Sequence, residues 1–290
     1  MVIYMKRLLL YCKRKLNIIL LSALSLLMVL PLWFVITGSF MGAGEFTQNF
    51  SAVLNDTTGK VYWPLFPAYP TLRSYAELLL DTPSFFVVFW NSCKQVFPSL
   101  IGQLMIAVPA AWSFARYNFK GKKAVFTLYI ILMIMPFQVT MVSSYLVLDY
   151  IHLLDSHLSI ILPAAFSTFP VFIMVKFFKS VPRALFEAAS MDGAGEWRIF
   201  WNIGIPMGRG GIISAIILDF LEIFNAIEQP LNFIKNPSLQ PLTLYLSGIS
   251  ADKAGISLIS SFIMLLPALL IFLYGQQYLE QGIMVSGLKE

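Results

Sequence analysis

Charge is scarce in this 290-residue sequence: only 12% of its residues are Asp, Glu, Lys or Arg, whereas soluble domains carry about 25%. Together with 58% hydrophobic residues and a mean hydropathy of +0.76, this scarcity excludes a soluble globular protein and indicates a membrane protein. The formal net charge of +5 is explained by membrane insertion and anionic lipid headgroups, so we expect no nucleic-acid partner.

The sequence is also poor in residues that build catalytic and metal sites. It has only two cysteines, Cys12 and Cys93, and two histidines, His152 and His157, which lie close together in one predicted loop. It contains neither the G-x-x-x-x-G-K-[ST] phosphate loop nor the H-E-x-x-H zinc motif. We therefore expect no disulfide framework, no catalytic residue and no metal or cofactor bound by this chain, and we disfavour a membrane-embedded enzyme.

Apolar segments are abundant, and six of them reach or nearly reach the roughly 20 residues that a helix needs to cross about 30 Å of hydrocarbon. They are residues 16–40, about 90–115, 124–148, 158–175, about 208–227 and 254–279. The first is too long for a secretory signal and no cleavage site follows it, so we expect an uncleaved anchor. The predicted fold is all-α and polytopic, with six transmembrane helices in one domain over residues 1–290.

Seven prolines lie inside these segments, where we expect them to interrupt the helices. They are Pro31, Pro98, Pro109, Pro136, Pro163, Pro170 and Pro267.

The distribution of lysine and arginine predicts the orientation. Six spans place both termini on one side, and if that side is the cytoplasm it receives 15 of the 20 basic residues. These are Lys6, Arg7, Lys13, Arg14, Lys15, Arg116, Lys120, Lys122, Lys123, Lys176, Lys179, Arg183, Arg198, Arg209 and Lys289. We therefore expect cytoplasmic termini and three outer loops: about 41–89 with a short helix at 71–79, a short loop around 149–157, and about 228–253.

The stretch "SVPRALFEAASMDG", residues 180–193, is polar and Ala-rich although apolar segments flank it. Pro182 suits the first turn of a helix and Gly193 suits the left-handed residue after its last turn. Glu187, Ala188 and Met191 share one face at helical spacing. We expect a cytoplasmic docking helix, and the alternative is an amphipathic helix bound only to lipid.

The residues Glu187-Ala188-Ala189, then Gly193, then Ile203-Gly204-Ile205-Pro206 resemble the EAA motif of permease subunits of binding-protein-dependent ABC importers. The fuller form "EAASMDGAGEWRIFWNIGIP" resembles the carbohydrate branch of that family, which includes the smaller maltose-permease subunit. The resemblance extends over nearly the whole chain. It implies the type I permease fold in a plasma or inner membrane and an import of sugar or oligosaccharide delivered by an extracytoplasmic binding protein.

The resemblance also implies partners and residue roles. Such a subunit pairs with a homologous permease and with two ATP-binding subunits, which hold the ATP and Mg²⁺. Residues 180–206 would then form the coupling helix and lead into the fifth span, and the tail at residues 282–289 would reach between the ATPases. The implied coupling residues are Glu187, Ala188, Ala189, Met191, Asp192 and Gly193.

The predicted fifth span also carries a polar stripe, formed by Asp219, Glu222, Asn225 and Gln229 at helical spacing. Ionisable groups inside a bilayer are costly and mark functional sites. The stripe either faces the solute pathway or pairs with Lys94, Arg209 or the partner permease. Lys94 itself either reaches the outer interface or serves as a counter-ion for an anionic sugar such as a uronate.

Two rival functions stay open at this point. The same architecture could import a non-sugar solute, such as a polyamine or a glycerol phosphodiester. An ion-coupled secondary transporter would need membrane-buried coupling sites and inverted repeats.

Overall fold

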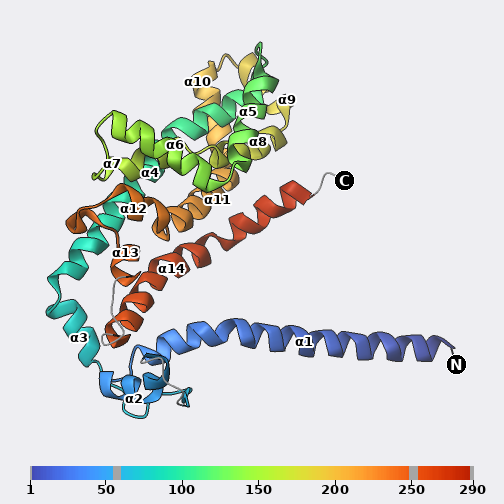
Figure 1. Cartoon of the computed structure of the whole chain (residues 1–290). Helices are drawn as coiled ribbons and strands as arrows, with labels where there is room; N and C mark the ends of the chain where they lie inside the picture. Colours follow the sequence, from blue (N-terminus) through green and yellow to red (C-terminus); the bar gives the residue numbers. More distant parts are fainter. Residues whose placement is uncertain (1, 55–59, 248–253, 288–290) are drawn as a thin grey trace. The chain divides into compact units, whose positions relative to one another are not determined.

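The structure is a computed structural model that describes residues 2–54, 60–247 and 254–287 (Figure 1). Every regular element in those ranges is a helix. The helices are α1 (Val2–Gly38), α2 (Ala43–Leu54), α3 (Arg73–Leu80), α4 (Pro83–Arg116), α5 (Lys122–Ile134), α6 (Phe137–Tyr150), α7 (Leu158–Ala165), α8 (Phe169–Ser180), α9 (Arg183–Met191), α10 (Glu196–Ile199), the π-helix η1 (Phe200–Gly204), α11 (Ile205–Phe224), α12 (Glu228–Phe233), the 3-10 helix η2 (Pro237–Leu239), α13 (Leu242–Ser247) and α14 (Ala254–Gly287).

The residues form two compact units: Met1–Thr82 with Ile249–Ile263, and Pro83–Gly248 with Met264–Glu290. Aromatic rings hold the first unit together. Phe46 and Phe50 lie one turn apart on α2 and stack with their ring centroids 4.7 Å apart, and Phe50 also meets Phe34 of α1 at 5.5 Å. Trp33 of α1 donates its indole N–H to the carbonyl oxygen of Leu65 at 2.9 Å. Residues on both sides of positions 55–59 thus contact α1.

The predicted short helix at residues 71–79 is confirmed as α3. We did not predict α2, whose sequence "AGEFTQNFSAVL" mixes polar and apolar residues and in which Phe46 and Phe50 pack together. The boundary expected near residue 90 is also wrong, because α4 begins at Pro83.

In the second unit, α4, α8 and α11 pack against one another (Figure 1). Trp112 of α4 lies at the centre of the main apolar cluster, with its ring 5.5 Å from Phe178 of α8 and 5.6 Å from Phe200 of η1. Glycines on α11 allow this close packing: a Cβ atom at Gly208 would lie 2.2 Å from the ring of Phe178.

This close packing gives a testable prediction. We expect Gly208→Ala to lower the thermal unfolding midpoint of the purified chain by several degrees, because the added methyl would push α11 away from Phe178. Gly44→Ala is the matched control, since a Cβ atom there meets nothing within 4 Å. Equal midpoints for the two variants would contradict the packing.

Four helical segments in the described part of the chain are long and apolar enough to cross a membrane, or five if one bent pair counts as a single span. The bent pair is α5 with α6, which meet at 103° on either side of Met135 and Pro136. The expected interruption at Pro136 is therefore confirmed, and the segment expected at residues 124–148 consists of α5 and α6. A proline cannot donate the helical hydrogen bond, so the chain turns there.

The remaining prolines behave differently from one another. Pro170 begins α8 after a break at residues 166–168, so the segment expected at residues 158–175 consists of α7 and α8. Five prolines lie within continuous helices, so the expected interruption of those helices is wrong. They are Pro31 in α1, Pro98 and Pro109 in α4, Pro163 in α7 and Pro267 in α14.

Candidate functional site

Helix α9 has the boundaries that the sequence predicts. Pro182 is its N-cap residue and the helix ends at Met191. Gly193 follows with φ of 80°, a left-handed conformation that glycine adopts without steric cost, and its N–H donates to the carbonyl oxygen of Ser190 at 3.1 Å. Residues 180–206 therefore contain a short helix, a glycine turn, α10 and η1 before α11 begins.

One face of α9 is exposed in the part of the chain that the structure describes. Glu187, Ala188 and Asp192 are exposed, and Met191 is 83% exposed. An exposed methionine between two carboxylates offers both apolar and charged contacts to a second protein. Ala189, by contrast, is half-buried and packs against the cluster around Trp112.

The inner face of α9 is anchored by Phe186. Its side chain is 3% exposed and its ring lies 5.3 Å from that of Trp112, edge to face. The guanidinium of Arg116, at the end of α4, lies 5.0 Å from the centre of the same ring. Helix α9 is therefore fixed to the end of α4.

A second link joins α4 to α10. Arg116 forms an ion pair with Glu196 at 3.9 Å, and the hydroxyl of Tyr117 donates to the other carboxylate oxygen of Glu196 at 2.8 Å. Burial raises the pKa of the Tyr117 phenol, and the bond to Glu196 raises it further. The phenol therefore stays a donor. Because α10 continues through η1 into α11, α9 and α10 are connected to both α4 and α11.

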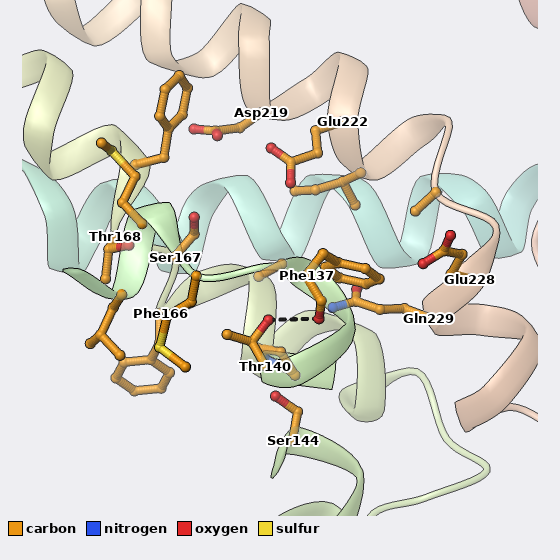
Figure 2. A pocket seen from close by; sticks show the side chains of 18 of the residues that line it. Phe137, Thr140, Ser144, Phe166, Ser167, Thr168, Asp219, Glu222, Glu228 and Gln229 are labelled. Atoms are coloured by element: carbon orange, nitrogen blue, oxygen red, sulfur yellow. Dashed lines mark hydrogen bonds between the residues drawn. The ribbon is translucent and has the colours of Figure 1, made fainter. Parts of the chain in front are cut away.

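A pocket of about 690 Å³ lies between α4, α11, the α5–α6 bend and the α7–α8 break (Figure 2). This volume is within the range of pockets that bind small molecules. Its polar lining includes Gln103, Thr140, Ser144, Ser167, Thr168 and Gln229, and its carboxylates are Asp219, Glu222 and Glu228. The two interrupted helix pairs thus provide irregular backbone where a cavity is lined, as membrane proteins require.

Three of the four residues of the predicted polar stripe line the pocket. Asp219, Glu222 and Gln229 line it, whereas the amide of Asn225 donates to the carbonyl oxygen of Leu221 in its own helix at 2.8 Å. Lys94 is exposed on α4 and is not among the lining residues. Sequence reasoning missed Gln103, Thr140 and Ser167, and the only available signal was the polar character of residues 167–168 and 138–144 between apolar runs.

A second row of polar residues on α4 binds residues 238–240. Asn91 donates to the carbonyl oxygens of Ser238 and Gln240 at 2.7 and 3.1 Å, and Gln95 donates to Leu239 at 3.1 Å. The sequence shows these residues at helical spacing, but not that they face a loop. Residues 248–253 of the predicted outer loop lie outside the described residues.

His157 also belongs to this region and is half-buried rather than fully solvated. The amide nitrogen of Gln95 lies 3.3 Å from its Nδ1 atom. Burial lowers the pKa of His157, and the nearby charge of Lys94 lowers it further. The neutral ring can accept the hydrogen bond from Gln95.

The region around Trp112 and the row at Asn91 lie at opposite ends of α4. They are 21 residues apart (112 − 91), which corresponds to about 30 Å along a helix and to the thickness of the hydrocarbon core. The pocket, which includes Gln103 of the same helix, lies between them.

The family described as "Binding-protein-dependent transport system inner membrane component" matches residues 103–285. This match covers more than half of the chain. The chain belongs to this family. The permease is therefore a multi-pass inner membrane protein and a subunit of an ABC importer, a family of transporters rather than enzymes. The predicted family membership is confirmed.

Relatives and solved structures agree. The permease is 33% identical to a probable ABC transporter permease protein of Pyrococcus horikoshii, over 76% of this chain and 82% of that protein. It is 28% identical to an arabinooligosaccharide transport system permease of Bacillus subtilis, over 92% of each chain.

A chain of a bacterial ABC transporter that imports the acidic polysaccharide alginate has the same fold. Its TM-score is 0.76 at 19% identity, covering 91% of this permease and 95% of that chain. A second alginate transporter structure, in complex with an alginate pentasaccharide-bound periplasmic protein, matches with a TM-score of 0.63 at 16% identity and similar coverage. The expected ABC importer permease fold is confirmed.

Proposed function

We propose that this permease translocates a sugar or oligosaccharide that an extracytoplasmic binding protein delivers. The name of the arabinooligosaccharide relative, which aligns over nearly the full length, supports the solute class. The alginate transporter in complex with a sugar-bound periplasmic protein supports the mode of delivery.

The observation that carries the mechanism is the connection between α9 and the pocket. Helix α4 contributes Gln103 to the pocket and Arg116 to the contacts of α9, and α11 contributes Asp219 and Glu222 and is continuous with η1 and α10. Closure of two ATP-binding subunits on α9 would therefore shift both helices that line the pocket. Such a rigid connection between two sites is what coupling over this distance requires.

In this proposal Glu187 and Asp192 pair with basic groups of the ATPase, and Ala188 and Met191 make close apolar contact. Ala189 keeps α9 packed on the permease, and Gly193 makes the turn. ATP and Mg²⁺ belong to the ATPase subunits, and a homologous permease completes the pathway. The C-terminal segment, which is helical to Gly287, reaches toward the ATPases.

The membrane topology is part of the same proposal. The whole chain forms one transmembrane domain, with α1, α4, α5–α6, α7–α8, α11 and α14 as its six spans and both termini in the cytoplasm. Clustering of basic residues supports this orientation: Lys179 and Arg183 lie near Lys122, at the end of the second unit that carries α9. The loop held by Asn91 then faces the outside.

The decisive experiment is co-purification of the permease with its partners, followed by measurement of ATP hydrolysis. We expect the solute-loaded binding protein to stimulate hydrolysis. Thermal stabilisation of the binding protein by candidate solutes identifies the solute, because a ligand that binds the folded state raises its melting temperature. Uptake that survives loss of the ATPase subunits would contradict the proposal and favour a secondary transporter.

The outer loop gives a separate prediction. We expect Asn91→Ala to weaken docking of the binding protein by about tenfold, because two part-buried hydrogen bonds to Ser238 and Gln240 are lost, each with a net contribution of about 0.5–1.5 kcal/mol. Asn225→Ala is the control, since its amide bonds within its own helix. Docking affinity measured on the reconstituted complex should fall only for Asn91→Ala, and an equal effect of both would contradict the role of this loop.

A further inference from the structure

We propose that the pocket selects its solute by charge: it takes a neutral or cationic saccharide and excludes anionic ones. This inference rests on the proposed function and concerns the pocket between α4, α6 and α11. Figure 2 shows Asp219 and Glu222 on one side of this pocket and Thr140 and Ser144 on the other.

Three acidic side chains line the pocket. Asp219 is only 2% exposed, and its Oδ2 atom has no hydrogen-bond partner among the described residues although it lines the pocket. A buried carboxyl oxygen without a partner is costly, so a ligand that donates a hydrogen bond to it has much to gain. Glu222, one turn further along α11, and Glu228 add two more carboxylates.

Among the described residues that line the pocket, no basic side chain neutralises these acidic groups. None of the described lining residues is lysine, arginine or histidine. Arg209 lies ten residues before Asp219 on the same helix (219 − 209), which is about 15 Å along the axis. Throughout the part of the chain that the structure describes, the one ion pair is Arg116 with Glu196, and neither residue lines the pocket.

The remaining lining suits a polyhydroxyl compound. The side chains of Gln103 and Gln229 offer both donors and acceptors, as sugar hydroxyls require. The hydroxyl of Thr140 donates to the carbonyl oxygen of Phe137 and offers an acceptor. The rings of Phe137, Phe166 and Phe169 provide apolar surface for the faces of sugar rings. The carboxylates of Glu222 and Glu228 would attract a protonated amino group on the sugar, whereas they would repel a uronate or phosphate.

This charge pattern separates the permease from the alginate importer that shares its fold, because alginate is acidic. It also argues against a glycerol phosphodiester and against Lys94 as a counter-ion for a uronate, since Lys94 is not among the lining residues.

The test compares three trisaccharides of equal length on the purified complex of permease, partner permease and ATPases, without binding protein. The probes are a glucose trimer, a glucosamine trimer and a galacturonic acid trimer. At pH 7 and low salt we expect the galacturonic acid trimer to bind about tenfold more weakly than the glucose trimer, because like charges a few ångströms apart repel strongly at intermediate dielectric. The difference should shrink in 1 M salt, where the screening length is about 3 Å.

Variants locate the effect. The double variant Glu222→Gln, Glu228→Gln should remove most of the discrimination while keeping hydrogen-bonding groups of the same size. Glu77→Gln is the control, because Glu77 is exposed on α3 and is not a lining residue. In this variant the ratio of binding between the glucose trimer and the galacturonic acid trimer should equal that of the unchanged protein.

Two results would overturn the inference: equal or tighter binding of the galacturonic acid trimer, or no binding of any of the three probes. Either result leaves the proposed function standing if solute-loaded binding protein still stimulates ATP hydrolysis. Loss of that stimulation in the unchanged complex would instead contradict the proposed function itself.

Discussion

Gly193→Pro and Glu187→Lys are each expected to reduce uptake by about tenfold or more while the complex retains ATP hydrolysis and membrane insertion. Gly193 has φ of 80°, which proline cannot adopt because its ring fixes φ near −65°, and proline also removes the bond from the Gly193 N–H to Ser190. Reversal of the exposed Glu187 charge would repel the basic group expected on the ATPase. Uptake and hydrolysis are measured in the same proteoliposomes.

Glu77→Lys is the matched control for this charge reversal, because Glu77 is an exposed glutamate on α3, in the other compact unit. Its ratio of uptake to hydrolysis should equal that of the unchanged complex. Normal uptake in both Gly193→Pro and Glu187→Lys would contradict a coupling role for α9.

Phe186→Ala is expected to weaken the connection between the exposed face of α9 and the pocket. The Phe186 ring is buried against Trp112 and Arg116, and its removal leaves a cavity that costs about 3–5 kcal/mol in a well-packed core. The exposed face of α9 is unchanged, so the ATPases should still assemble. We expect the solute-loaded binding protein to lose most of its stimulation of hydrolysis, and the backbone amides of α9 to exchange hydrogen faster.

Leu185→Ala controls for the loss of an apolar side chain from the same helix, because Leu185 is 43% exposed. Hydrogen exchange in α9 should be unchanged in this variant. If Phe186→Ala preserved full stimulation, α9 would not transmit movement through its inner face.

Local rules of helix formation sufficed to predict α9 and the acidic part of the pocket. Pro182 and Gly193 mark the ends of α9 because each has its own backbone constraint, and these constraints do not depend on distant residues. Likewise Asp219 and Glu222 share a face of α11 through helical spacing alone, and the structure places both in one pocket. The predicted stripe is not one continuous helix face, because α11 ends at Phe224 and Gln229 reaches the pocket from α12.

Features that depend on partners distant in sequence could not be predicted. Periodicity shows that Asn91 and Gln95 share a face of α4, but not that a segment nearly 150 residues later packs there. The proline at position 136 signals a break, but its position in the sequence does not give the 103° angle between α5 and α6. The sequence does not distinguish Phe186 from other apolar residues, because its contacts with Trp112 and Arg116 appear only in the structure.

The most direct test of the account is site-specific photo-cross-linking from α9 in the assembled transporter. A photo-reactive amino acid replaces Met191, which is 83% exposed, and in a matched variant it replaces Tyr150, which is 85% exposed at the end of α6. We predict that the probe at position 191 cross-links to the ATP-binding subunit, identified by mass spectrometry of its phosphate-loop peptide, and that the probe at position 150 does not. Cross-linking of position 191 to the extracytoplasmic binding protein, or to lipid alone, would contradict the claim that α9 is where ATP hydrolysis drives this permease.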